Sequence, residues 1–229
     1  MDAVVATLKR LGTRATRDGM ARYAIPSDRA FGVTVAALQK LAKDLGRDHD
    51  LAVGLWATGW YEARMLASFV GEPDRVTPAL MDRWCRDFDN WAVCDTVCFH
   101  LFDRTRHAWG KLEPWSRLPG EFQKRAAFAL LWGLTVHDKS ARDESFTRGL
   151  DLIERAADDD RNFVKKAVNM ALRATGKRNP ALHAAAVEVA RRLADSPEPA
   201  ARWVGKDALR ELTGASVARR LAARGRATP

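Results

Sequence analysis

Apolar residues recur along this chain at the three- and four-residue spacing of amphipathic helices, and no stretch shows a convincing strand pattern. Val33, Leu38, Leu41 and Leu45, for example, form one apolar stripe. After a short opening helix, the pattern predicts helices over residues 33–45, 48–58, 60–70, 79–86, 121–136, 142–156, 162–175, 180–194 and 199–212, with another beginning near Asn90 in the stretch 87–102. The expected fold class is therefore all-α.

Prolines and glycines mark the expected ends of these helices. A turn is expected at Ile25-Pro26-Ser27, a break between Pro73 and Pro78, and a loop over residues 109–119, which contain two prolines. Gly176 is expected to stop the helix that begins near residue 162. The tail from Arg219 onward is expected to be frayed.

The composition is that of a soluble globular protein. Of the 229 residues, 47% are hydrophobic, which is enough for one core or one continuous array of helices. No apolar run approaches the ~20 residues that cross a bilayer, and the N-terminus lacks the features of a signal peptide. Cys85, Cys94 and Cys98 are expected to be buried thiols, with a metal site that includes His100 as the alternative. We therefore expect a cytoplasmic monomer without membrane contact.

The net charge of +9 is concentrated in the C-terminal third. Residues 161–229 contain 15 Lys or Arg against 5 Asp or Glu, whereas residues 1–160 contain 23 against 24. A solvated basic face would explain this excess, and so would a surface that binds a phosphate backbone.

A weak repeat runs through the helices: an aromatic residue is followed three positions later by a cation in four of five cases. The pairs are Tyr61 with Arg64, Trp91 with Cys94, Phe122 with Arg125, Phe163 with Lys166, and Trp203 with Lys206. Their spacing approaches the ~40-residue period of HEAT-type helix pairs. Stacked repeats would align Arg64, Arg125, Lys166 and Lys206 along one concave surface, here called the cationic row, which Cys94 interrupts.

Asp95 follows this interruption and is the most anomalous charge in the chain. A helix that begins near Asn90 places Trp91 and Asp95 about one turn apart, with Asp95 among Cys98 and Phe99. A carboxylate on an apolar face is costly unless it is paired, hydrogen-bonded or used in function. Asp95 is therefore either a structural partner of an Arg from a neighbouring helix or a functional group.

Several motifs resemble the AlkD-type DNA alkylation repair glycosylases over nearly the whole chain. They are Arg22-Tyr23, Phe31-Gly-Val33, Leu55-Trp56, Tyr61-Glu-Ala-Arg64, Trp91-Ala-Val-Cys-Asp95, Gln123-Lys-Arg-Ala-Ala127 and, most specifically, residues 163–179 from Phe163 to Asn179. The resemblance implies a right-handed solenoid of HEAT-like antiparallel helix pairs that holds duplex DNA. We expect one domain over residues 1–229, with residues 1–30 forming its N-terminal helices.

The resemblance also implies the roles of individual residues. Trp91 and Asp95 would act at the lesion, while Arg125 and Tyr23 would approach the DNA there. Where the family commonly has a second Trp, this chain has Met170, so one aromatic wall beside the lesion is missing or replaced by a thioether.

The expected reaction is release of N3- and N7-alkylated purines from double-stranded DNA without a pocket that encloses the base. An alkylated purine is cationic, so its glycosidic bond is already weak, and a carboxylate with an aromatic face can stabilise the oxocarbenium-like sugar. No metal and no cofactor are needed. Further phosphate ligands are expected at the end of the helix that Gly176 stops, namely Arg173, Lys177 and Arg178. Bound to DNA, the protein would associate with the nucleoid.

Two other functions fit the same pattern. A catalytically weak or inactive repeat protein could bind bent, branched or damaged DNA, and Met170 keeps this possibility open. A scaffold for other proteins is the second alternative, although it predicts an apolar or acidic groove, which the basic C-terminal third disfavours.

Overall fold

The computed structural model describes the backbone of residues 1–225, and over that range it consists of α-helices, short 3-10 turns and connections, without a strand. Its internal contacts divide the chain into two compact units, Met1–His107 and Ala108–Pro229. The prediction of one domain over residues 1–229 stays a prediction. None of the helices described is both long and apolar enough to span a membrane.

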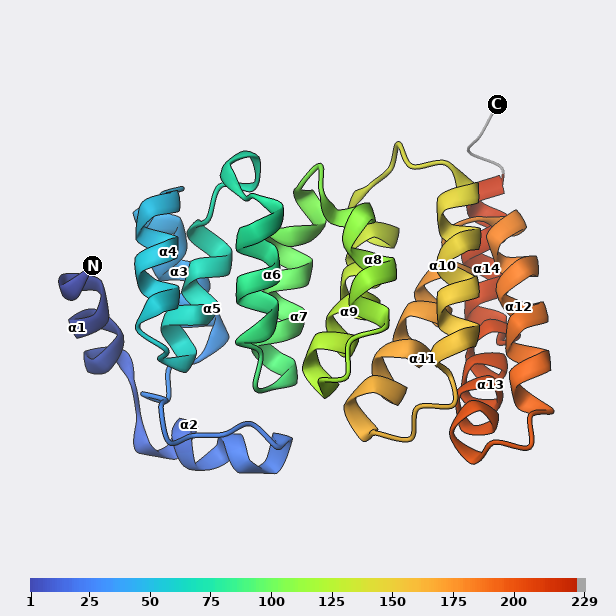
Figure 1. Cartoon of the computed structure of the whole chain (residues 1–229), viewed down its shortest axis with the longest axis horizontal. Helices are drawn as coiled ribbons and strands as arrows, with labels where there is room; N and C mark the ends of the chain where they lie inside the picture. Colours follow the sequence, from blue (N-terminus) through green and yellow to red (C-terminus); the bar gives the residue numbers. More distant parts are fainter. Residues whose placement is uncertain (226–229) are drawn as a thin grey trace. The chain divides into compact units, whose positions relative to one another are not determined.

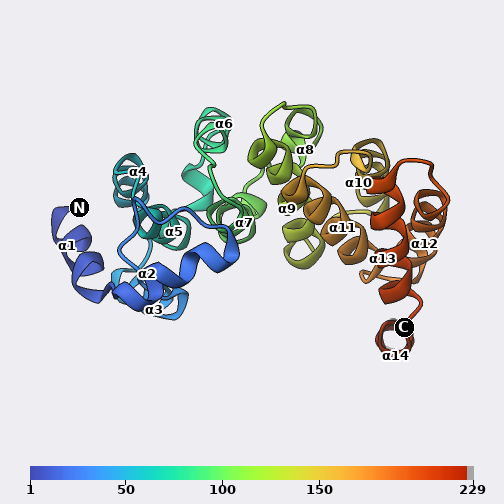
Figure 2. The same cartoon turned by 90° about the horizontal axis from the view of Figure 1, so that it is seen from below.

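The helices of the first unit lie side by side in two rows, here called outer and inner (Figure 1). Its helices are α1 (Asp2–Leu11), α2 (Arg14–Gly19), α3 (Val35–Leu45), α4 (His49–Ala57), α5 (Tyr61–Val70), α6 (Pro78–Arg86) and α7 (Trp91–His100). Helix α5 contacts α3, α4 and α7. Figure 2 shows α4 and α6 in one row and α5 and α7 in the other.

Side-chain caps set the starts of five helices in this unit, including Thr13 at the start of α2. Thr34, Asp48, Thr77 and Asn90 each accept a hydrogen bond from the backbone N–H three residues ahead, which satisfies one of the donors that a helix start leaves open. The predicted helix near Asn90 is confirmed and begins at Trp91.

The N-terminal segment, residues 20–33, is attached to α5 through a buried carboxylate. Glu62 is fully buried, and its two oxygens accept hydrogen bonds from the backbone N–H groups of residues 31–33 at 2.9, 2.6 and 3.1 Å. The backbone of Gly32 has φ +85°, and a Cβ there would lie 2.2 Å from the oxygen of Thr13, so only glycine fits. The segment therefore folds against the helix array.

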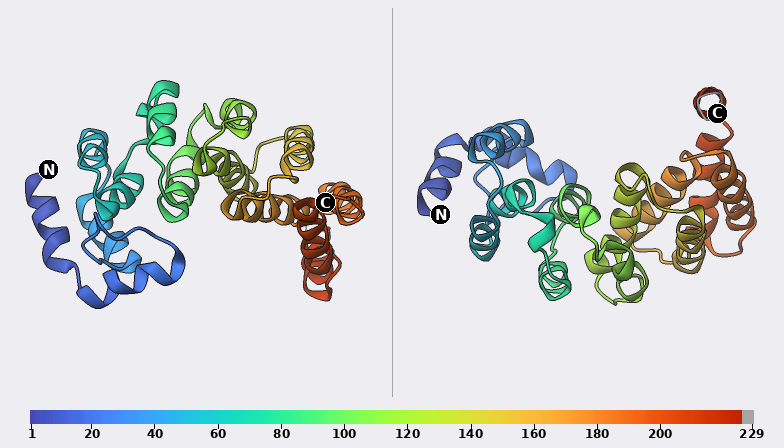
Figure 3. Two further views of the ribbon diagram at one scale, coloured as in Figure 1. Left: turned by 60° about the horizontal axis from the view of Figure 1, so that its bottom comes forward. Right: turned by 90° about the horizontal axis from the view of Figure 1, so that it is seen from above.

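The second unit stacks three inner helices, α9, α11 and α13. Its helices are α8 (Ala108–Ser116), α9 (Glu121–His137), α10 (Asp143–Ala156), α11 (Asn162–Gly176), α12 (Pro180–Ala194), α13 (Pro199–Leu212) and α14 (Ala215–Gly225). Helix α11 contacts both α9 and α13. Within this unit, Figures 2 and 3 show α8 and α10 as an outer row beside α9 and α11.

Contacts at a nearly constant sequence offset show that neighbouring inner helices run parallel. Near the two ends of α9 and α11, Phe163 donates to Glu121 and Arg178 donates to Thr135, at offsets of 42 and 43 residues. Between α11 and α13, Asn169 donates to Val204 and Arg173 donates to Glu211, at offsets of 35 and 38 residues. This register agrees with the predicted repeat. Helices α12 and α13 approach closely at Gly205, where a Cβ would lie 2.2 Å from the backbone nitrogen of Ala194.

Two predictions about irregular regions differ from the structure. Residues 108–116 form helix α8 rather than a loop, because Ala108, Leu112 and Trp115 make a buried stripe that outweighs the helix-breaking tendency of Pro114. Helix α14 continues through Arg219, since its Val217 and Leu221 are buried one turn apart. Residues 226–229 of the expected frayed tail lie outside the described residues.

Candidate functional site

The predicted pair of site residues lies in the first two turns of α7. Trp91 is its first residue, and Asp95 follows one turn later. Asn90 fixes this start: its Oδ1 accepts from the N–H of Val93 at 2.9 Å, and its Nδ2 donates to Asp89 at 2.7 Å. Both Trp91 and Asp95 are partly exposed. The two side chains are therefore held on one helix and open to solvent.

Trp91 is fixed by the N-terminal segment. Its indole Nε1 donates a hydrogen bond of 2.8 Å to the backbone oxygen of Tyr23. Tyr61 and Trp91 pack together against a small buried cluster of Met20, Ile25, Ala30 and Ala92. The side chain of Tyr23 itself is 65% exposed. The structure thus brings Tyr23, Trp91 and Asp95 into one region of the first unit.

Asp95 lies within electrostatic range of a buried thiol. Burial raises the pKa of Cys98 well above its usual value, and a hydrogen bond with Cys94 and the negative charge of Asp95 add to the effect. Cys85, Cys94 and Cys98 are buried thiols that form no disulfide, as predicted. Cys98 is therefore a neutral packing residue beside the carboxylate.

A polar cavity of about 220 Å³ lies beside the start of α7. Charges of both signs line it, together with Tyr61, whose pKa is raised to about 12 by burial. The polar lining consists of Asp28, Arg29, Tyr61, Arg64, Asp89 and Asn90. Because the charges balance, the cavity does not by itself select a phosphate.

The cationic row is only partly at the surface. Arg125 is 5% exposed and donates to the backbone oxygen of Phe163 at 2.6 Å. The side chain of Arg64 is 16% exposed, lies over the ring of Trp56, and donates to the backbone oxygen of Asp87. The predicted surface position is therefore wrong for these two arginines, because both cations point between helices.

The predicted surface position is also wrong for Cys94, the residue expected to interrupt the row, because Cys94 is fully buried. In the second unit, by contrast, Lys166 and Lys206 are exposed on α11 and α13. Their contact with DNA stays a prediction.

The predicted phosphate ligands at the end of α11 have protein partners. Arg173 and Lys177 both pair with Glu211, and although burial alone would raise the pKa of Glu211, their hydrogen bonds lower it. Arg178 donates to the backbone oxygens of residues 135 and 141 and lies 4.2 Å from the ring centroid of Phe146. A phosphate at Arg173 or Lys177 would have to compete with Glu211.

Met170 is partly buried on α11, in the second unit, whereas Trp91 and Asp95 belong to the first. Its expected position beside the lesion stays a prediction. The described residues bring no three His, Cys, Asp or Glu side chains together as a metal site would.

Sequence reasoning missed the residues that support Trp91. The sequence motif Tyr61-Glu-Ala-Arg64 contains both Tyr61 and Glu62, but it assigned neither residue a role in supporting Trp91. Glu62 precedes Ala63 and lies one turn before Leu66, both fully buried, so a carboxylate on the buried side of a predicted helix was the available signal.

Comparison with known proteins agrees with this architecture. The model of a family described as DNA alkylation repair enzyme matches residues 4–212. No curated protein matches the chain. One solved structure, described as "a new family of proteins related to the HEAT-like repeat DNA glycosylases with affinity for branched DNA structures", is similar with a TM-score of 0.75 and 22% sequence identity, over 93% of this chain and 95% of that chain. The predicted all-α fold of HEAT-like helix pairs is thus confirmed.

Proposed function

The chain belongs to the DNA alkylation repair enzyme family, and we propose that it is a DNA glycosylase that releases cationic N3- and N7-alkylated purines from duplex DNA. The observation that carries this proposal is the pair on α7. Trp91 and Asp95 are one turn apart and partly exposed, and Trp91 is held in place by the backbone of Tyr23 and by a small buried cluster.

This pair supplies what the reaction needs. As the bond to a cationic purine breaks, positive charge moves onto the deoxyribose, and the fixed carboxylate of Asp95 stabilises that charge. The face of Trp91 packs against the sugar and contributes a cation–π interaction of ~0.5–2 kcal/mol. Water then adds to the sugar. The purine leaves as a neutral base, so no acid is required to protonate it.

The bond from Trp91 to the backbone of Tyr23 makes the site rigid before DNA arrives. An indole ring that is anchored at its nitrogen and packed against the cluster of Met20, Ile25, Ala30 and Ala92 keeps its orientation at little entropic cost on binding. In this proposal the exposed side chain of Tyr23 contacts the DNA backbone.

A direct experiment is to incubate the protein with duplex DNA that contains N7-methylguanine and to measure the released base by chromatography. We expect release from this duplex and none of unmodified guanine, because only the alkylated base carries the charge that weakens its bond. If the methylated base is released no faster than in buffer alone, the chain is not a glycosylase for this lesion.

DNA binding should depend on salt. The exposed Lys166 and Lys206 neutralise phosphates in this proposal, so the logarithm of affinity should fall linearly with the logarithm of salt concentration, by ~0.9 per phosphate neutralised. Lys166→Ala and Lys206→Ala should each reduce the slope by about one. Fluorescence anisotropy with labelled duplex measures both quantities.

The matched control is Lys9→Ala, which removes an exposed lysine from α1 in the first unit. It should leave the slope unchanged. An affinity that does not vary between low and moderate salt would contradict phosphate binding.

A second function, binding of branched DNA without excision, is favoured by two observations on this chain. Arg173 and Lys177 are held by Glu211 rather than left open, and Met170 stands where a second aromatic residue is expected. The similar solved structure is described as having affinity for branched DNA. Tight binding of a four-way junction combined with no release of methylated base would support this function over the first.

A further inference from the structure

Trp203 on α13 is an exposed aromatic residue with no role in the proposed excision. All eight tryptophans lie in the described part of the chain, and Trp203 is the exposed one, with 41% of its surface accessible. A large aromatic surface left in water is unfavourable and often marks a binding site.

Lysines surround this ring. The Nζ of Lys165, on the neighbouring α11, lies over the ring at 5.3 Å from its centroid. Lys206 follows Trp203 by one turn on α13, and Lys166 adjoins Lys165 on α11. Helices α11 and α13 are in contact and lie side by side (Figure 2). We group their residues Lys165, Lys166, Trp203 and Lys206 as the Trp203 surface.

The charges of the three lysines on this surface are not neutralised by the protein. Among the described residues no carboxylate lies within ion-pair distance of Lys165, Lys166 or Lys206. The acidic residues that follow on α13 are already engaged, Asp207 by Arg210 and Glu211 by Arg173 and Lys177. The surface therefore combines a flat aromatic face with free positive charge.

We propose that the Trp203 surface binds unpaired DNA, with one base stacked on the indole and the adjoining phosphates at Lys166 and Lys206. Every base has a π-face, so such stacking tolerates any sequence, and it requires a base that is not already stacked within a duplex. The site would recognise a single-stranded flank, gap or branch. This binding is separate from base excision, and the inference rests only on the proposal that the chain binds DNA.

The charge around the ring selects this ligand over an apolar partner. A hydrophobic peptide segment would bury three ammonium groups without compensating them, which is strongly unfavourable. A nucleotide strand brings one phosphate for each base, so stacking and charge neutralisation occur together.

The test compares a blunt duplex with the same duplex extended by a single-stranded thymine overhang. Trp203→Ala should weaken binding of the extended DNA ~10-fold, the effect of losing one stacked base, and change binding of the blunt duplex less than twofold. In wild-type protein, 2-aminopurine in the overhang should lose fluorescence on binding through stacking, and this loss should disappear in Trp203→Ala.

Two further variants make the result specific. Trp203→Phe keeps an aromatic face and should retain most of the preference for the overhang, whereas Val136→Ala, which removes another exposed apolar side chain of the same unit, should bind like wild type. An equal loss of affinity for blunt and extended DNA would overturn the proposal, because it would show that Trp203 contacts DNA without stacking on an unpaired base. No change with either DNA would overturn the proposal and assign Trp203 to a protein partner.

The outcome is separable from that of the excision proposal. Release of N7-methylguanine from the blunt duplex by Trp203→Ala reports on the chemistry at Trp91 and Asp95, which involves no unpaired DNA. If Trp203→Ala still releases the methylated base but loses its preference for the overhang, the result supports the inference. If the wild-type protein releases no base, the overhang measurement remains valid, because it involves no chemistry.

Discussion

Asp95→Asn should reduce release of N7-methylguanine by about 10²–10³-fold, the usual loss when one preorganised charge contact is removed from a transition state. Asn keeps the volume and hydrogen-bonding shape of the side chain but removes its charge, so the change isolates electrostatic stabilisation of the sugar cation. Binding of undamaged duplex and the melting temperature should stay close to wild type. Single-turnover release and thermal melting, measured on one preparation, give both values.

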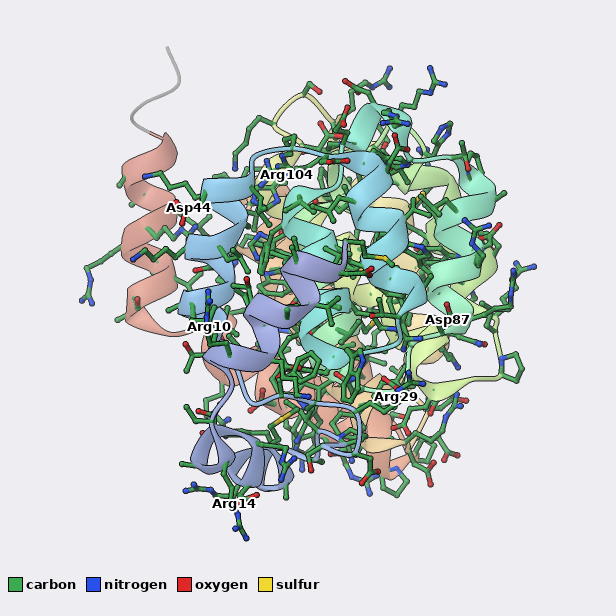
Figure 4. The ribbon with its side chains drawn as sticks, turned by 90° about the vertical axis from the view of Figure 1, so that its left-hand side faces the viewer. Arg10, Arg14, Arg29, Asp44, Asp87 and Arg104 are labelled. Carbon is green, nitrogen blue, oxygen red and sulfur yellow. The ribbon has the colours of Figure 1, made fainter. Side chains whose placement is uncertain are left out.

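The matched control is Asp44→Asn, which removes a negative charge from an exposed residue of α3 in the same unit (Figure 4). Its rate of release should equal that of wild type. If Asp95 instead balances a buried Arg, its loss should destabilise the protein by ~3–5 kcal/mol, because the Arg would be left unpaired. A large fall in melting temperature, with release in proportion to the folded fraction, would assign Asp95 a structural role.

Glu62→Gln should lower the stability of the first unit by ~2–3 kcal/mol, because hydrogen bonds to a buried charged acceptor contribute about 1.5–3 kcal/mol each. One oxygen of Glu62 accepts from two N–H groups and the other accepts from Phe31 at 2.9 Å. An amide keeps the first oxygen but turns an NH₂ group toward the N–H of Phe31. Urea unfolding gives the loss, and hydrogen exchange at residues 31–33 shows where it occurs.

Glu72→Gln provides the comparison, because Glu72 also accepts a backbone hydrogen bond, from His49 at 3.1 Å, but its side chain is 37% exposed. Solvent can replace that bond, so we expect a loss below ~1 kcal/mol. Glu62→Gln should also slow base release, since the segment that Glu62 holds is the one that anchors Trp91. Equal losses of stability in the two variants would show that Glu62 does not hold the segment.

The features that the sequence could predict are those set by neighbouring residues. Asn90 at the start of α7 and the apolar stripe of α3 each act within one or two turns, so the helices and the spacing of Trp91 and Asp95 follow from the local pattern. The ~40-residue period likewise predicts parallel inner helices, which the hydrogen bonds near both ends of α9 and α11 confirm.

The features that the sequence could not predict depend on packing between segments that are distant along the chain. A cation three residues after an aromatic can point outward, as Lys166 does, or between helices, as Arg125 does. Its direction depends on how the neighbouring helix packs against it. Glu62 binds residues about 30 positions away, and no local pattern indicates that partner. The same limit applies to α8, where buried contacts outweigh Pro114.

The anchor of Trp91 has a consequence for sequence variation at position 23. Because the indole bonds to the main-chain oxygen of Tyr23, any residue that keeps the local backbone conformation supplies the same acceptor. The phenol ring of Tyr23 takes no part in this hydrogen bond. Substitutions at position 23 that preserve the backbone should therefore leave the anchor of Trp91 intact.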